Sequence, residues 1–148
     1  MKLKAEVTID ADRKTVWRYF DDADKLVEWQ PGLTSVTHAS GVPGQPDAVR
    51  QLHFKEKDRS RMETEMITAR REPDFLAGTT ESATGTAVVV NQFEEAGEGS
   101  TRWVAYWNYR FKGKARLTAL FTHKSVQKRI EADMQRFKLL VETSESSS

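Results

Sequence analysis

The 148-residue chain is long enough for one domain with a substantial core, and its 23 basic and 22 acidic residues leave a net charge of only +1. This balance predicts no general attraction to nucleic acid or to an anionic membrane, and no apolar run approaches the ~20 residues that a membrane helix needs. Cysteine is absent, which excludes disulfides, thiolate metal ligands and a cysteine nucleophile, and the first residues lack the apolar centre of a secretory signal, so we expect a cytoplasmic protein.

The first predicted element is a strand over residues 2–9, where apolar and polar side chains alternate with the two-residue period of a half-buried strand. A helix of about two turns follows, because Asp10 or Asp12 can accept a hydrogen bond from a free backbone N–H at its start. The apolar side of this helix consists of Val16, Trp17 and Phe20.

A second short helix is predicted in the segment DADKLVEWQPG, residues 22–32, where Pro31 ends the helix and Gly32 supplies a turn. Its apolar residues are Leu26, Val27 and Trp29. Isolated helices shorter than ~12–15 residues are marginal in water, so tertiary contacts must stabilise this one. We therefore expect its apolar side chains to close one end of the core.

The next ninety residues predict six strands separated by turn residues at hairpin spacing. These strands cover residues 33–40, 49–57, 61–71, 75–82, 86–93 and 101–111. From about Lys114 the apolar period changes to that of a long amphipathic helix without internal Gly or Pro. Its apolar positions are Val126, Ile130, Met134, Phe137 and Val141.

This order of elements predicts an α+β fold in which a curved seven-stranded antiparallel sheet wraps around the long C-terminal helix, the only element long enough to cover one face of the sheet. The sequence also resembles the START-like, or SRPBCC, superfamily of polyketide cyclase/dehydrase-like proteins, whose fold is called the helix grip. The resemblance rests on VTIDADRKTVWRYF, DADKLVEWQPGLTSV and GSTRW, followed by the terminal helix. It implies one helix-grip domain over residues 1–142, after which we expect a disordered polar tail at 143–148.

A cavity between sheet and helix is the expected functional feature, because a flat sheet and a cylindrical helix do not mate closely. Strand parity selects inward-facing Met, aromatic and aliphatic residues, and the alternative for each of them is ordinary core packing. The candidate ligand-binding residues are Trp29, Leu52, Phe54, Met62, Met66, Val88, Val90, Trp103, Ala105, Trp107, Tyr109 and Met134. No catalytic residue is assigned, although Tyr106 and Tyr109 are weak candidates.

Polar strand residues that face the cavity would need a hydrogen-bonding partner or a ligand, whereas charged strand residues usually face solvent. The residues in question are Arg50, Gln51, His53, Glu63, Glu65, Glu81, Asn91 and Gln92. The three histidines are too far apart to predict a metal site, and nucleotide-binding motifs are absent, so no metal and no cofactor are expected.

Two further segments are ambiguous. Lys124, Lys128 and Arg129 form a basic group on the last helix, but acidic residues follow it, which indicates an ordinary solvated face. The loop ASGVPGQPDA, residues 39–48, is either a flap at the cavity mouth or a plain connection stiffened by proline.

Three functions are compatible with the sequence. Binding of a small hydrophobic molecule, such as a lipid, a polyketide-like compound or another planar apolar ligand, is the first, with no nucleic acid partner and no membrane span. A cyclase or dehydratase using the same cavity is the second. The resemblance also allows a protein-interaction module of the chaperone-activator or quinone-binding kind, which would work through its surface and would have a filled interior.

Overall fold

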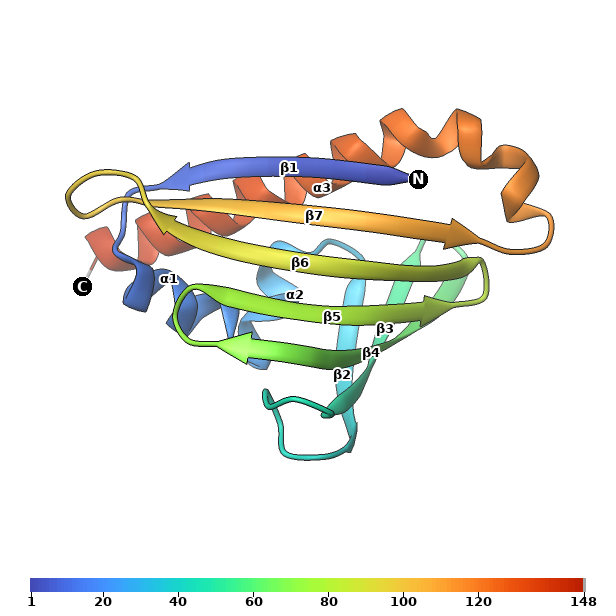
Figure 1. The fold of residues 1–148 in the computed structure, drawn as a ribbon, viewed down its shortest axis with the longest axis horizontal. Helices are drawn as coiled ribbons and strands as arrows, with labels where there is room; N and C mark the ends of the chain where they lie inside the picture. Colours follow the sequence, from blue (N-terminus) through green and yellow to red (C-terminus); the bar gives the residue numbers. More distant parts are fainter. Residues whose placement is uncertain (148) are drawn as a thin grey trace.

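The computed structural model describes residues 1–147, and within them seven strands form one antiparallel sheet in the order β1-β7-β6-β5-β4-β3-β2 (Figure 1). This arrangement confirms the predicted helix-grip fold. The elements are β1 (Lys2–Ile9), α1 (Arg13–Phe20), the 3-10 helix η1 (Ala23–Lys25), α2 (Leu26–Trp29), β2 (Leu33–Ser40), β3 (Val49–Glu56), β4 (Arg59–Arg71), β5 (Phe75–Ser82), β6 (Gly85–Glu95), β7 (Thr101–Phe111) and α3 (Ala115–Ser146).

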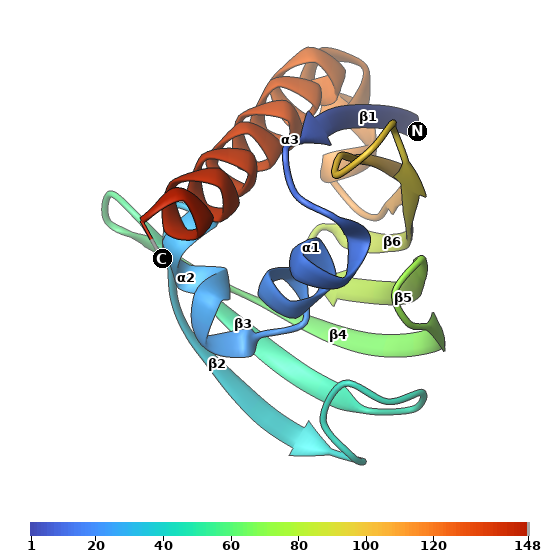
Figure 2. The same cartoon turned by 90° about the vertical axis from the view of Figure 1, so that its left-hand side faces the viewer.

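The sheet curves strongly from β1 round to β2, and α3 lies along the side toward which it curves (Figure 2). Both α1 and α2 lie at one end of the curved sheet, next to the C-terminal half of α3 (Figure 2). The N-terminal strand β1 pairs with β7, so the first and last strands of the chain are neighbours and the sheet edges are β1 and β2.

The short helices begin and end at residues that the sequence predicts. Asp12, rather than Asp10, caps α1 and accepts a hydrogen bond from the backbone N–H of Thr15 at 2.8 Å. Gly32 follows α2 with a φ of +85°, a backbone conformation that favours glycine. A single turn of helix cannot bury every side, and Val27 is 43% exposed, so its predicted place in the core is wrong.

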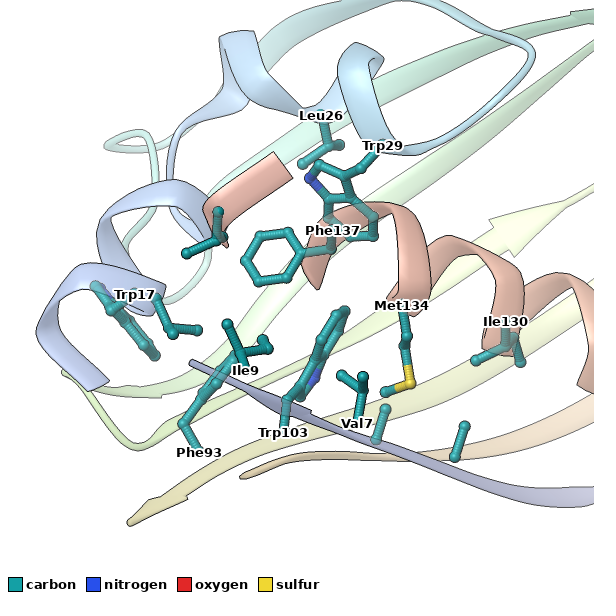
Figure 3. Packing of buried hydrophobic residues seen from close by; sticks show 14 of the residues in the cluster. Val7, Ile9, Trp17, Leu26, Trp29, Phe93, Trp103, Ile130, Met134 and Phe137 are labelled. Carbon is teal, nitrogen blue, oxygen red and sulfur yellow. The ribbon is translucent and has the colours of Figure 1, made fainter. Parts of the chain in front are cut away.

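The core is built around Phe137 of α3, which is fully buried (Figure 3). The ring centroid of Phe137 lies 5.2 Å from that of Trp29 and 5.1 Å from that of Trp103, in tilted edge-on contacts that aromatic pairs prefer. Four of the five predicted apolar positions of α3 are buried, and they lie one turn apart along the face toward the sheet: Ile130, Met134, Phe137 and Val141. Trp29 therefore joins the sheet to α3, as its predicted place at the end of the core requires.

Helix α3 extends to Ser146, past the boundary at residue 142 after which we expected a disordered tail. Contacts with α1 hold this last turn in place, because Tyr19 donates a hydrogen bond to Oε2 of Glu145 at 3.0 Å and Arg18 pairs with Oε1 of the same residue at 3.2 Å. The composition of the segment gave no sign of these tertiary contacts. Ser148, the last residue of the expected tail, lies outside the described residues.

The predicted parity is correct on β3, where Leu52 and Phe54 are buried, but it is wrong on β4. Met62 and Met66 are exposed on the outer face of β4. The inner positions carry charge instead, since Glu63 lies opposite Leu52 in the register of β3 and β4. Ion pairs, described below, allow these charges to face inward. The sequence of β4 alternates Met with charged residues, and this alternation alone does not show that the charges are paired.

The parity is also wrong on β6, where Val88 is exposed and Val90 is half-buried. The sequence of β6 contains aliphatic residues at both parities, so its period alone does not choose a face. Phe93 decides the orientation, because its ring is fully buried and stacks on Trp103 with centroids 5.9 Å apart. Ala87 and Val89, at the same parity as Phe93, are therefore the buried positions.

Candidate ligand-binding cavity

A cavity of about 640 Å³ lies between the inner face of the sheet and α3. Strands β2 to β7, the short helix α2, the loop after β2 and the first half of α3 all contribute to its wall. Of the twelve predicted ligand-binding residues, eight line it: Trp29, Phe54, Met66, Trp103, Ala105, Trp107, Tyr109 and Met134. The described chain therefore leaves unfilled space where the fold predicts it.

The other four candidates do not line the cavity. Leu52 faces inward but is packed in the core, while Met62, Val88 and Val90 follow the outward parity of β4 and β6. Met66 has the same outward parity and borders the cavity beside Gly78, where β4 and β5 approach closely. A Cβ added at Gly78 would lie 2.7 Å from the Met66 carbonyl oxygen, so this approach requires glycine.

Strand β7 supplies a continuous aromatic wall. Its inward positions place Trp107, Tyr109 and Phe111 in a row at alternate residues. Successive rings are stacked nearly parallel, with centroids 5.7 Å apart in both pairs and interplanar angles of 8° and 9°. Ala105 continues the row without a large side chain, so the wall is recessed at that position.

Charged side chains from β3 and β4 line another part of the wall. Arg50 pairs with Glu65, its neighbour across the two strands, with nitrogen-to-oxygen distances of 2.9 Å from Nε and 2.7 Å from Nη2 to Oε1. Arg61 donates a hydrogen bond to Glu63, and its guanidinium lies 4.0 Å from the ring centroid of Phe54. Each of the two inward carboxylates is therefore matched by an arginine.

Helix α3 adds a group that titrates near neutrality. Burial raises the pKa of Asp133 to about 6 from an ordinary 3.8, although the nearby cations Arg129, Arg136 and Arg61 act in the opposite direction. Arg136 donates to Oδ1 of Asp133 at 3.3 Å. A carboxyl group in the cavity wall thus changes charge within the range that proton transfer at neutral pH would use.

Tyr109 joins this charged group to the aromatic wall. Burial raises the pKa of its hydroxyl, and Arg129 on α3 lies within 3.5 Å of the hydroxyl oxygen. Tyr109 therefore stays a neutral phenol, able to donate and accept hydrogen bonds inside the cavity. The other predicted tyrosine, Tyr106, lies on the outward parity of β7 with its ring near Lys4.

Two indole N–H groups in the cavity wall have no protein acceptor. Nε1 of Trp29 and Nε1 of Trp107 are buried, and neither donates to any of residues 1–147. Trp103 differs, because its Nε1 donates to Oδ1 of Asn91 at 3.0 Å. A buried donor without an acceptor destabilises the folded protein, and an oxygen atom of a bound molecule would satisfy it.

The loop between β2 and β3 reaches the cavity, as the flap interpretation requires, through Pro43 and Gly44. Arg70 of β4 holds this loop, because it donates to the carbonyl of Gly44 at 2.9 Å and to both carboxylate oxygens of Asp21 at 2.6 and 2.9 Å. The same guanidinium lies 5.1 Å from the ring centroid of Trp17. The loop is thus attached to the end of α1.

Among the polar strand residues named from the sequence, Arg50, Glu63, Glu65 and Asn91 line the cavity, and Gln51, His53, Glu81 and Gln92 do not. Arg61, Arg129 and Asp133 were missed as cavity residues. Helical spacing was the available signal for two of them, since positions 129 and 133 flank the apolar positions 126, 130 and 134.

Within residues 1–147, no three His, Asp or Glu side chains come together as metal ligands would. The described helices include none with the length and apolar character to cross a bilayer.

A family model described as "Polyketide cyclase / dehydrase and lipid transport" matches residues 1–142. The chain belongs to this family. Membership of the polyketide cyclase/dehydrase and lipid transport family confirms the START-like, SRPBCC resemblance that the motifs indicate. No curated protein matches this family member significantly in sequence.

Solved structures share the fold of this family member over nearly its whole length. Ara h 8.0201 has a TM-score of 0.80 at 16% identity, covering 97% of this chain and 98% of its own. The protein TTHA0849 from Thermus thermophilus has a TM-score of 0.77 at 16% identity, covering 97% and 99%. The ZhuI aromatase/cyclase from a Streptomyces species has a TM-score of 0.79 at 14% identity, covering 96% and 93%. At these identities the likeness concerns the fold.

Proposed function

We propose that the protein binds a small amphipathic molecule, with a planar apolar body and a few oxygen atoms, in the cavity between the sheet and α3. The observation that carries the proposal is the stacked row of Trp107, Tyr109 and Phe111 along an unfilled volume of about 640 Å³. That volume lies within the ~300–1,000 Å³ typical of small-molecule sites. Membership of a family described by lipid transport and polyketide chemistry supports hydrophobic binding in general.

The polar part of the wall indicates which chemical groups the ligand carries. On β3 and β4, Arg50 and Arg61 are already paired with carboxylates, so a ligand anion at either one would have to displace an ion pair. The indole N–H groups of Trp29 and Trp107 lack acceptors, and the hydroxyl of Tyr109 can donate as well. Carbonyl or hydroxyl oxygens on a largely apolar ligand fit these donors better than a strongly charged group does.

A cyclase or dehydratase is the second candidate, and Asp133 is the observation that favours it. A carboxyl group with a pKa of about 6 beside Arg129 and Arg136 is suited to accept or donate a proton near neutral pH. Glu63 and Glu65 are less suited, because arginine partners hold them in ion pairs. If the protein is an enzyme, Asp133→Asn abolishes turnover while ligand binding persists. Binding without any turnover in the wild type supports a carrier instead.

The unfilled cavity also favours a pocket-based function over a module that works only through its surface. No metal or cofactor enters the proposal. A cytoplasmic location stays our expectation, supported by the absence of cysteine.

Fluorescence titration with Nile red, an uncharged planar dye with a carbonyl oxygen whose emission rises in apolar surroundings, tests the proposal. Ala105→Trp fills the recess in the aromatic wall and is expected to weaken dye binding at least tenfold. Val88→Trp places the same side chain on the outer face of the neighbouring strand and serves as the matched control. Ala105→Leu is a milder filling variant if the tryptophan disturbs folding. Saturable binding that neither filling variant weakens would contradict the proposed site.

A further inference from the structure

The first turns of α3 expose large apolar side chains to solvent. Leu117, Leu120 and Phe121 are 79%, 90% and 85% exposed, the highest values among the large apolar residues that the structure describes as exposed. Their spacing of three and four residues places them on one side of the helix. Exposed apolar residues scattered singly need no explanation, but three adjacent ones on one helical face mark a binding surface.

This face points away from the cavity. Ala115, Thr118 and Thr122 of the same turns line the cavity, and they lie on the opposite side of the helix from the exposed apolar residues. The first turns of α3 extend beyond the end of β7, at the right of Figure 1, where no strand covers them. The three apolar side chains are therefore available to a partner without any unfolding.

Basic residues surround this apolar group, and acidic residues are absent from the segment. Between residues 110 and 128 there are six Lys or Arg and no Asp or Glu, although the whole chain has a net charge of only +1. All six are exposed, and none forms an ion pair within residues 1–147. They are Arg110, Lys112, Lys114, Arg116, Lys124 and Lys128.

We propose that the first turns of α3 are a docking site for an anionic lipid bilayer, with Leu117, Leu120 and Phe121 inserted among the acyl chains and the surrounding cations at the headgroups. Amphipathic helices that bind membrane surfaces combine these two features. Each Lys or Arg near an anionic leaflet adds to the attraction, and six on one segment add substantially.

Charge complementarity selects the bilayer over the other occupants of such a surface. A second copy of the chain, joined through the same face, would bring the two sets of six cations together without a compensating acid. A nucleic acid would neutralise the cations but would leave Leu117, Leu120 and Phe121 in water. An anionic bilayer satisfies both the charge and the apolar group.

Docking in this orientation would place the cavity beside the lipid. The cavity wall includes exposed residues at the turn between β5 and β6 and at the start of α3, so the cavity reaches the surface close to the apolar group. Ala115 and Thr118 separate the two by only the width of the helix. Docking goes beyond the proposed ligand binding and does not depend on it, because the apolar and basic residues act from the outer face.

Co-sedimentation with vesicles of equimolar phosphatidylcholine and phosphatidylglycerol tests the proposal, with pure phosphatidylcholine vesicles as the neutral comparison. The wild type is expected to bind the anionic vesicles at least tenfold more tightly than the neutral ones, and added salt should weaken that binding. The double variant Leu120→Ser, Phe121→Ser should lose at least tenfold in affinity. Leu139→Ser removes a residue of α3 that is 66% exposed outside this segment, and it should bind as the wild type does.

A charge variant separates the two contributions. Lys112→Glu, Lys114→Glu leaves the apolar residues in place and should abolish the preference for anionic vesicles. Circular dichroism checks that each variant is folded, which the exposure of all the substituted side chains favours. Absence of wild-type binding to anionic vesicles, or equal binding by the double serine variant, would overturn the proposal. Light scattering that shows a wild-type dimer, lost in the double serine variant, would assign this surface to self-association and would overturn it too.

Discussion

The short helix α2 owes its stability to the burial of Trp29 against other elements. A comparison of Trp29 with Val27, another apolar residue of the same helix, tests this. Trp29 is 5% exposed, whereas Val27 on the same turn is 43% exposed. Trp29→Ala should therefore destabilise the fold strongly, and Val27→Ala should change its stability by less than ~0.5 kcal/mol. Because the two positions share one helical turn, both variants perturb helix propensity in the same place.

The expected magnitude follows from the contacts of Trp29. Truncation of a buried tryptophan to alanine costs ~3–5 kcal/mol. The ring loses its neighbours Phe137 at 5.2 Å and Trp103 at 5.8 Å, which favours the upper part of that range. The unpaired indole N–H offsets some of the cost, because its burial is itself unfavourable. We expect about 4 kcal/mol for alanine, and only about 1 kcal/mol for Trp29→Phe, which keeps a ring and removes the unpaired donor.

Urea unfolding followed by circular dichroism measures these values, and thermal unfolding supplies an independent check. For a domain of this size 1 kcal/mol corresponds to about 2–4 °C in the melting temperature, so Trp29→Ala should melt about 8–16 °C lower than the wild type. An unchanged melting temperature for Trp29→Ala would show that Trp29 does not close the core. A loss as large in Val27→Ala would show that the effect comes from the helix and not from burial.

Three further predictions concern paired and capping residues, each measured as the free energy of unfolding in urea. Arg70→Met should cost about 2 kcal/mol, because it breaks the bonds from Arg70 to Asp21 at the end of α1 and to the loop after β2. Arg71→Met loses an exposed ion pair with Asp74 and a contact with the Phe75 ring, and it should cost under ~1 kcal/mol. Equal losses would show that the Arg70 contacts do not stabilise the fold. Asp133→Asn should stabilise the protein at pH 8 by on the order of 2 kcal/mol, because burial raises the pKa of Asp133 from 3.8 to about 6 and its ionisation above pH 6 opposes folding. This gain should fall between about pH 6 and pH 4 and disappear below about pH 3, where the carboxyl group is protonated in both the folded and the unfolded state. A gain that does not vary with pH would rule out the burial. Asp12→Ala should cost about 1 kcal/mol through loss of the α1 cap, while Asp10→Ala should cost less, and the reverse order would move the cap to Asp10.

The fold could be predicted because local signals agree with the overall topology. Alternation in β1, turn residues between strands, the stop at Pro31 and the four-residue spacing along α3 each favour the same arrangement. Where one face of a strand is plainly more apolar, as in β7, the parity also follows from the sequence. The buried positions of α3 could be predicted for the same reason.

The charged part of the cavity wall could not be predicted, because its residues violate the usual rule that charge faces solvent. Glu63 and Glu65 face inward since Arg61 and Arg50 pair with them, and pairing across strands depends on register, which composition does not reveal. On β6 aliphatic residues at both parities left the choice of face to the burial of Phe93.

The net charge of +1 concealed a local feature in a similar way. Averaged over the whole chain, the charges predict no attraction to anionic membranes, yet the segment 110–128 carries six cations and no acid. Acidic residues further along α3 made the basic group on this helix resemble an ordinary solvated face. Only the position of the segment, beyond the end of β7 and beside exposed apolar residues, distinguishes it.

The central claim is that the space between sheet and helix admits a small molecule. A crystal structure of the protein with Nile red bound tests it most directly. The account predicts the aromatic rings of the dye against Trp107 and Tyr109, next to Ala105. Dye bound only on the outer face of the sheet, or a space closed by the protein's own side chains, would contradict it.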